Sequence, residues 1–350
     1  MKRYYITACL IGFLASPSCR RPVLYQESRM MMGTVLSIEL AAPGSGRAAD
    51  ALDACWSEAE RLEKIFSRYM PESELNRINR EAGLKPVGVS GEMMAVLSRS
   101  VEISRLTGGA FDVTVGPLME IWGFFPQRKG RLPTGEEIGQ ALSRCGWEKI
   151  ELDRSGRTVR FRVPGLTIDL GGLAKGYVVD RLAALLVSKG IKSALVNAGG
   201  DIYCLGRYPD GRRWRIGMEH PRDDDEVLTV LELSDRAVAT SGDYRNYFVR
   251  RRKRYSHIID PRTGRPAGSG VVESSVLAPD CATADALATA LFVVGAKDGL
   301  KLLGDVEGAD GIIVTEEKDR IAVHFSDRLS ESRASENAGR AGPADRREIR

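Results

Sequence analysis

The segment IDLGGLAKGYVVD, residues 168–180, constrains the fold most, because glycines separate a strand-like stretch from a helical one. A buried-looking strand is expected to end at Asp169, and Gly171 and Gly172 then allow a tight turn. Backbone N–H groups at the start of the following helix favour an anion. The segment matches neither GxxxxGK[ST] nor GxGxxG. It therefore leaves open both an anion site that includes Lys175 and a purely structural turn.

Strand-like and helical patterns alternate irregularly along the rest of the chain. Apolar residues at spacings of three and four predict a helix that begins near Arg47. Similar patterns predict a helix over 175–189 and a long helix from about Thr283 to Leu303. Because the regular alternation of a doubly wound sheet is missing, we expect an α+β fold of mixed sheets with packed helices. A composition that is 43% hydrophobic and 28% charged is typical of an ordered globular protein.

The first residues indicate export. Lys2 and Arg3 precede an apolar run that is shorter than the roughly 20 residues needed to span a bilayer. The sequence LASPSC is similar to a degenerate bacterial lipobox, in which Cys19 would become lipidated; simple secretion is the alternative. We therefore expect a signal peptide over 1–18 and an exported protein. A lipid anchor would hold it to the membrane at the periplasmic face of the inner membrane.

The charge pattern excludes one class of partner. The formal net charge is only +4, and basic and acidic residues are interleaved, so no nucleic-acid partner is expected. One basic run, Arg250–Arg254, either forms a solvated hairpin turn or attracts anionic membrane lipids or nucleotide phosphates. The mature domain is expected over 19–325. The segment 326–350 is poor in aromatic residues and mixed in charge, and is expected to be disordered.

The cysteines do not form a metal-binding pattern. Beyond the leader they are widely separated, and no CxxC pair is present: Cys55, Cys145, Cys204 and Cys281. This spacing indicates neither a zinc site nor an iron–sulfur site. We expect these cysteines to be free, buried thiols.

A few side chains are candidates for chemistry. Asp285 and Thr289 lie four residues apart in TADALATAL, so they share one helical face and could help hold Mg²⁺. An acidic residue favoured by the helix dipole is the alternative. His257 in SHIIDPRTG is either a general base or a structural histidine. Tyr69 and Phe111 could stack on a flat ring, although aromatic residues more often pack in cores.

The order of the motifs is more specific than any one of them. From residue 30 to about 315 the chain contains MGT, FSRYMPESELNRIN, GGAFDVTVGPL, DLGGLAKGYVVD, NAGGDI, SGDYRNYF, HIIDPRTG and ADALATALFVVG. This succession resembles the ApbE family of FAD:protein FMN transferases. The resemblance implies an ApbE-like fold and an exported, Mg²⁺-dependent enzyme. Such an enzyme breaks the pyrophosphate of FAD, passes FMN to a Thr or Ser hydroxyl on a partner flavoprotein and releases AMP.

The resemblance also implies roles for individual residues. Those expected at the FAD site are Met32, Tyr69, Ala110, Phe111, Asp112, Asp169, Lys175 and His257. The expected Mg²⁺ ligands are the carbonyl oxygen of Ala174 and the side chains of Asp285 and Thr289. Asp285 and His257 are the expected catalytic residues, with His257 activating the acceptor hydroxyl and Tyr69 lying against the isoalloxazine ring. The acceptors that the family suggests are respiratory electron-transfer subunits.

Two alternatives remain at this point. Water could replace the acceptor hydroxyl, which would make the protein a FAD pyrophosphatase that yields FMN and AMP; Tyr69 favours the transferase. A non-catalytic flavin-binding lipoprotein would keep the aromatic residues and could lose the metal ligands. The presence of Asp285, Thr289 and His257 favours an enzyme.

Overall fold

An eight-stranded sheet forms the centre of the protein. The computed structural model describes residues 22–125, 130–244, 246–318 and 320–330. The strand order is β1-β2-β6-β7-β10-β15-β16-β17, and each neighbouring pair is antiparallel. The strands are β1 (Val23–Met31), β2 (Thr34–Ala42), β6 (Ala194–Ala198), β7 (Asp201–Leu205), β10 (Arg236–Gly242), β15 (Val271–Ala278), β16 (Asp310–Glu317) and β17 (Arg320–Phe325).

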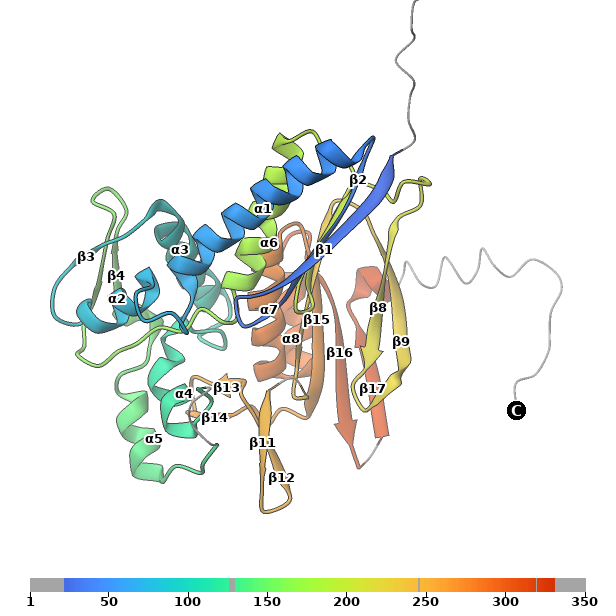
Figure 1. Ribbon diagram of the computed structural model, residues 1–350. Coiled ribbons are helices and arrows are strands. Elements are labelled where there is room, and N and C mark those ends of the chain that lie inside the picture. The colour runs from blue at the N-terminus through green and yellow to red at the C-terminus, as the bar shows by residue number, and fades with distance from the viewer. Residues whose placement is uncertain (1–21, 126–129, 245, 319, 331–350) are drawn as a thin grey trace, which may run out of the picture.

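The sheet is covered on both faces. Helices α1 (Ser45–Phe66), α6 (Ala174–Ser188), α7 (Cys281–Val294) and α8 (Ala296–Gly304) pack on one face (Figure 1). The hairpin of β8 (Trp214–His220) and β9 (Asp223–Leu233) covers part of the other. Side chains alternate between the two faces of the sheet along β10. Ala237 and Ala239 therefore pack in the core beneath the helices, whereas Val238 packs in the cluster beneath the β8–β9 hairpin.

Smaller elements surround one end of the molecule (Figure 1). A three-stranded sheet of order β3-β5-β4 lies with α2 and α3, and a separate apolar cluster unites α4, α5 and β13. These elements are α2 (Glu74–Glu81), α3 (Gly91–Leu106), α4 (Gly116–Trp122), α5 (Gly135–Leu142), β3 (Val87–Gly88), β4 (Ile150–Asp153), β5 (Thr158–Phe161), β11 (Tyr247–Arg250), β12 (Lys253–Ser256), β13 (Ile259–Asp260) and β14 (Arg265–Pro266), with the short 3-10 helices η1 (Val113–Val115) and η2 (Trp147–Lys149).

The predicted α+β class with packed helices is confirmed, and helix α1 begins at Ser45, close to the expected start near Arg47. The single long helix expected from Thr283 to Leu303 is instead two helices, α7 and α8. They are separated by Gly295, whose φ of 91° is incompatible with a continuous right-handed helix.

The strand expected to end at Asp169 is absent, since residues 166–170 have no regular secondary structure. Both backbone groups of Ile168 instead bond to the side chain of Asn79. The Ile168 N–H donates to the Asn79 side-chain oxygen at 2.8 Å, and the Asn79 amide donates to the Ile168 carbonyl at 3.0 Å. The Asn79 side chain thus provides the hydrogen bonds that Ile168 would have made in a sheet, which is the structure that the apolar pattern predicted.

The ordered domain continues past residue 325. The Ser326 N–H donates to the Gly311 carbonyl at 2.9 Å, Arg328 pairs with Asp310 at 2.9 Å, and residues 327–330 form a helical turn. The start of the predicted tail at residue 326 is therefore too early. Residues 331–350, the predicted leader over 1–18 and Cys19 lie outside the described residues.

The thiol prediction is confirmed, because Cys55, Cys145, Cys204 and Cys281 are all free and buried. Burial raises the pKa of Cys55 and of Cys204 to about 12, which keeps both protonated. Among the described residues, no helix has the length and apolar character required to cross a membrane.

Helices α6 and α7 are in direct backbone contact. A Cβ atom on Gly176 would lie 2.4 Å from the carbonyl oxygen of Cys281, so only glycine fits there. Next to this contact, the Asp180 carboxylate accepts the N–H groups of Cys281 at 2.7 Å and of Ala282 at 2.9 Å. These are first-turn N–H groups of α7, which have no partner within the helix. The contact joins segments that lie a hundred residues apart in the sequence.

Replacing Gly176 by alanine should lower the free energy of unfolding by about 3 kcal/mol or more, because the new methyl group overlaps backbone that cannot rotate away. Gly139→Ala is the matched control: Gly139 is exposed on α5 with no atom near its Cβ position, so that change should be neutral or stabilise by up to about 1 kcal/mol. Urea denaturation measures both. Similar stabilities for the two variants would contradict the proposed contact.

Candidate active site

A cavity of about 420 Å³ opens where α6, α7 and the ends of β7 and β10 meet the smaller apolar cluster. It brings together segments from most of the chain length. Among its lining residues are all those that the family motifs indicate: Met32, Tyr69, Ala110, Phe111, Asp112, Asp169, Ala174, Lys175, His257, Asp285 and Thr289.

The rim of the cavity is formed by the turn between β1 and β2 and by Tyr69. Met32 has a φ of 55°, and its N–H donates to the Glu63 carboxylate of α1 at 2.6 Å. A Cβ atom on Gly33 would lie 2.8 Å from Cε2 of Tyr69, so the ring lies against this turn. The Tyr69 side chain nevertheless remains 52% exposed, which leaves ring surface for stacking on a flat ligand.

The glycine turn approaches α7 closely. A Cβ atom on Gly172 would lie 3.1 Å from Oγ1 of Thr289 and 3.3 Å from the Phe111 ring. Any larger residue would push the turn away from the helix. Immediately afterwards α6 begins at Ala174, and no side chain caps its first turn. The glycines therefore place the start of α6 beside Thr289.

Lys175 lies between two buried carboxylates. Its Nζ is 2.8 Å from Oδ2 of Asp201 and 3.0 Å from Oδ2 of Asp285. Burial alone favours the neutral amine, but the two carboxylates raise the pKa of Lys175 above its ordinary value. Burial and the neighbouring Asp285 raise the pKa of Asp201 to about 8. The ammonium group is thus held by the protein's own carboxylates.

The oxygen atoms in this region suit a hard cation. Asp285 and Thr289 lie on one face of α7, beside Ala174, and Oγ of Ser241 is 3.3 Å from the Thr289 hydroxyl. Among the described residues, Oδ2 of Asp201 is paired with the Lys175 ammonium but accepts no hydrogen bond of good geometry. The described residues contain no cluster of three His, Cys, Asp or Glu side chains that could hold a metal. Mg²⁺ does not need such a cage, because it keeps waters and binds substrate phosphates, so this donor set fits it.

Arg68 adds a partly buried positive charge to the cavity wall. It pairs with the Asp169 carboxylate and lies over the Phe125 ring, 4.1 Å from the centroid. Within the described residues, Nε and Nη2 of Arg68 are buried without a hydrogen-bond partner. Unpaired buried guanidinium donors are costly. This cost would be relieved by an anionic ligand in the cavity.

His257 has a defined protonation state. Its Nδ1 is 3.0 Å from the Asn246 carbonyl oxygen, which can only accept, so Nδ1 carries the proton and Nε2 keeps a lone pair. Burial lowers the pKa of His257 below its ordinary value, although the Asn246 bond acts in the opposite direction. The imidazole is therefore neutral near pH 7 and available as a base.

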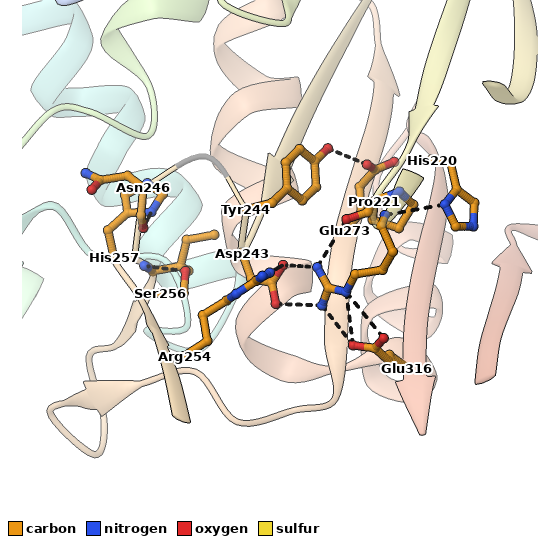
Figure 2. Close-up of polar contacts among 12 residues, drawn as sticks. His220, Pro221, Asp243, Tyr244, Asn246, Arg254, Ser256, His257, Glu273 and Glu316 are labelled. Carbon is orange, nitrogen blue, oxygen red and sulfur yellow. Dashed lines mark hydrogen bonds and ion pairs between the residues drawn. The ribbon is translucent and has the colours of Figure 1, made fainter. Parts of the chain in front are cut away.

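Ion pairs hold the segment that leads to His257. The Arg222 guanidinium donates to Asp243 at 2.8 and 2.9 Å and to Glu316 at 2.8 Å. Asp243 also pairs with Arg254 at 3.3 Å. Figure 2 shows Asp243 at the centre of these contacts, with His257 and Arg254 on one side and Glu316 on the other. The loop after β10 is thereby tied to strand β16 of the central sheet.

One expected cofactor residue has a structural use. Both carboxylate oxygens of Asp112 are occupied, since Oδ1 accepts from the backbone and hydroxyl of Thr114 and Oδ2 accepts from the Trp147 N–H at 2.9 Å. Burial raises the pKa of Asp112 above its ordinary value. Asp112 thus shapes the cavity wall through the backbone next to Phe111.

Two residues in the cavity were missed by sequence reasoning. Asp201 belongs to NAGGDI and Arg68 precedes Tyr69 in FSRYMPESELNRIN, so both lie inside motifs that the sequence analysis quotes. Their place inside these motifs is the one feature of the sequence that could have identified them as site residues. Nothing local indicated that Asp201 would face Lys175 or that Arg68 would pair with Asp169.

Comparison with known proteins agrees with this fold and site. The ApbE family pattern matches residues 32–313. A FAD:protein FMN transferase of Vibrio cholerae serotype O1 is 39% identical over 295 residues, covering 83% of this chain and 88% of the relative. The flavin transferase ApbE structure from Vibrio cholerae superimposes with a TM-score of 0.80 at 35% identity, over 89% of this chain and 99% of the other. The ApbE protein of Thermotoga maritima gives 0.81 at 35% identity, over 88% and 99%.

These similarities place the fold in the class represented by solved flavin transferase structures. The extent of the pattern match and the identity to the Vibrio cholerae relative decide the family. The chain belongs to the ApbE family.

Replacing Arg222 by glutamine should lower the free energy of unfolding by on the order of 1 to 3 kcal/mol, because Asp243 and Glu316 would lose their shared cation in a partly buried place. The control is Arg212→Gln, whose ion pair with Asp210 is largely exposed and should matter by less than about 0.5 kcal/mol. Guanidinium denaturation measures the difference. Equal effects would mean that the Arg222 contacts contribute no more than surface pairs.

Proposed function

We propose that this protein is a FAD:protein FMN transferase. It cleaves the pyrophosphate of FAD, links FMN through a phosphoester to a Thr or Ser hydroxyl of an acceptor flavoprotein and releases AMP. The observation that carries the proposal is the convergence of three groups in one cavity: the Tyr69 ring, the oxygen atoms of Asp285 and Thr289, and the neutral imidazole of His257. Relatives named FAD:protein FMN transferase support it.

FAD would enter with its flat ring at the rim and its phosphates deeper in the cavity. The isoalloxazine ring stacks on the exposed face of Tyr69, next to the Met32 turn. The pyrophosphate lies near the unpaired nitrogens of Arg68, which then gain charge-assisted hydrogen bonds. Ala110 and Phe111 complete the apolar wall.

A divalent cation would be held by the Asp285 carboxylate, the Thr289 hydroxyl and the Ala174 carbonyl, with Asp201 nearby. When bound, Mg²⁺ neutralises charge on pyrophosphate oxygens. Lys175 offsets part of the negative charge on Asp201 and Asp285, so the two acids can stay close together. Without a cation between them, the Asp285 carboxylate would repel the phosphate group.

His257 would move the proton. Its Nε2 accepts the hydrogen of the acceptor hydroxyl while that oxygen forms a bond to the FMN phosphorus. The bond between this phosphorus and the bridging oxygen breaks, and AMP leaves with the bridging oxygen. The Asn246 carbonyl holds the other ring nitrogen, which orients the imidazole and stabilises the imidazolium that forms.

Water is the competing nucleophile. Because His257 and the turn at Gly171 remain partly accessible, water could reach the same position and convert FAD into FMN and AMP.

We also propose that the protein is exported and anchored at the periplasmic face of the inner membrane through a lipid on Cys19. The leader pattern of the sequence supports this location.

The deciding experiment incubates the purified protein with FAD and Mg²⁺, with and without a flavoprotein that carries a flavinylation threonine. A flavin-sized mass gain on the acceptor together with AMP supports transfer. FMN and AMP without that gain support hydrolysis. Unchanged FAD in both reactions contradicts an enzymatic function. The Asp285→Ala variant serves as the negative control. It should show no metal-dependent turnover, because the cation loses its carboxylate ligand.

His257→Ala should reduce transfer at least about a hundredfold while FAD binding changes little, because the variant loses a base but no contact with the flavin ring. In the native protein, transfer should stay constant from pH 8 to pH 7 and fall only below the ordinary histidine range. The reason is that the lowered pKa keeps the imidazole neutral until more acidic conditions. Initial rates and fluorescence titration with FAD measure the two effects. Parallel losses of rate and affinity would make His257 a binding residue.

Arg68→Gln should raise the Kd for FAD by roughly tenfold to a hundredfold, the loss expected when charge-assisted hydrogen bonds are removed. Riboflavin lacks the pyrophosphate, so its affinity should change by less than about threefold. Isothermal titration with both ligands measures this difference. A similar loss for riboflavin would show that Arg68 only supports Tyr69 or Phe125.

A further inference from the structure

A basic hairpin stands beside the cavity. Strands β11 and β12 pair antiparallel and carry five consecutive basic residues, Arg250–Arg254, all of them exposed. Ser256 ends β12, and the next residue is His257. Figure 1 shows this hairpin extending away from the body of the protein. The predicted hairpin turn is confirmed, but the fold alone does not explain its charge.

The turn has a conformation that its residues do not favour. Arg251 and Arg252 have φ angles of 50° and 60°, as in a two-residue turn with both central residues left-handed. Such turns strongly prefer Asn-Gly, because a long side chain on Cβ is disfavoured at positive φ. The chain therefore keeps two arginines at the tip at a cost in conformational energy. A function that needs the positive charge of these two arginines would explain why the chain keeps them despite this cost.

The described part of the fold does not use the two tip arginines, Arg251 and Arg252. Arg254 is occupied by Asp243 at 3.3 Å and lies over the Tyr247 ring, 4.4 Å from its centroid. Arg250 reaches the Gly130 carbonyl at 3.4 Å. In the described ranges, no carboxylate lies within ion-pair distance of Arg251 or Arg252. Neither residue lines the FAD cavity.

The base of the hairpin is rigid. Phe248 and Tyr255 stack across the two strands with centroids 5.2 Å apart and planes 13° apart. Phe124 packs on Phe248 at 5.4 Å, and Trp122 packs on Tyr255 at 5.9 Å. The hairpin is thus joined to the apolar cluster of α4 and α5. A charged tip on an anchored base is presented in a defined place relative to His257.

We propose that the tip of this hairpin binds an acidic segment of the acceptor protein, next to the hydroxyl residue that enters the cavity. The inference rests on the transferase function proposed above. Two unpaired arginines attract carboxylates and speed the encounter with an acidic partner. Because β12 leads directly to His257, a segment held at the tip lies only the length of one short strand, about 16 Å, from the base that must take its proton.

A protein partner fits better than an anionic membrane. The first described strand, β1, starts at the end of the molecule opposite the hairpin (Figure 1). An anchor at Cys19 would precede Val23 by only a few residues, which span less than about 15 Å even when extended. The membrane would then face the end of the protein away from Arg251 and Arg252.

The test variant is Arg251→Asn with Arg252→Gly. It removes both charges and supplies the residues that the turn prefers, so the fold should be at least as stable as that of the native protein. The matched control is Arg157→Gly with Arg160→Gln. It also removes two exposed arginines, one of them at a φ of 47°, from the hairpin of β4 and β5, away from the cavity.

The probes are two labelled synthetic peptides with one threonine, flanked by aspartates in the first and by asparagines in the second. We expect the native protein and the control to bind the aspartate peptide at least about tenfold more tightly than the asparagine peptide at low salt, and 0.5 M NaCl should remove the difference. The test variant should lose this preference. Its affinity for FAD should be unchanged, because neither arginine lines the cavity.

An unchanged preference in the test variant would overturn the proposal, as would a native protein that does not discriminate between the peptides. Binding of the native protein but not the test variant to phosphatidylglycerol vesicles, without peptide discrimination, would assign the tip to the membrane instead. FAD turnover in the presence of the acceptor flavoprotein is read separately. A native protein that leaves FAD unchanged in that reaction fails as a transferase, whatever the peptide result.

Discussion

The contact between α6 and α7 is the constraint on which the rest of the site depends. Gly176 allows the two backbones to touch, and Asp180 accepts the first N–H groups of α7. This contact sets the start of α6 against the face of α7 that carries Asp285 and Thr289. Because both helices also pack on the central sheet, a small displacement there would move the carbonyl, carboxylate and hydroxyl oxygens apart.

Charge balance is the second organising feature of the cavity. Lys175 lets Asp201 and Asp285 approach each other, and Asp169 partly neutralises Arg68. Each charged group in this set thus has an oppositely charged neighbour in the cavity, while among the described residues some hydrogen-bonding capacity is left unused on Arg68 and Asp201. A buried site with paired charges and unused polar atoms is prepared for a ligand that brings phosphate oxygens and a cation.

The loop between β10 and β13 links this site to the outside. Its start is held by Arg222 and its hairpin by stacked aromatic rings, so His257 is placed by packing as well as by its bond to Asn246. The same hairpin displays the unpaired arginines at its tip. One segment would therefore serve two proposed steps of a transfer reaction, proton acceptance by His257 and capture of the partner.

Local patterns in the sequence were sufficient for the α+β class, the free buried thiols and the basic hairpin, because periodicity and turn residues report on neighbours along the chain. The order of the motifs was sufficient for the family and for many residues around the cavity, although Arg68 and Asp201 were missed. Folding alone revealed that Lys175 pairs with Asp201 and Asp285, that Arg68 pairs with Asp169, and that Gly295 divides the predicted long helix. These features depend on contacts between distant segments and on one backbone angle, and neither leaves a periodic signal in the sequence.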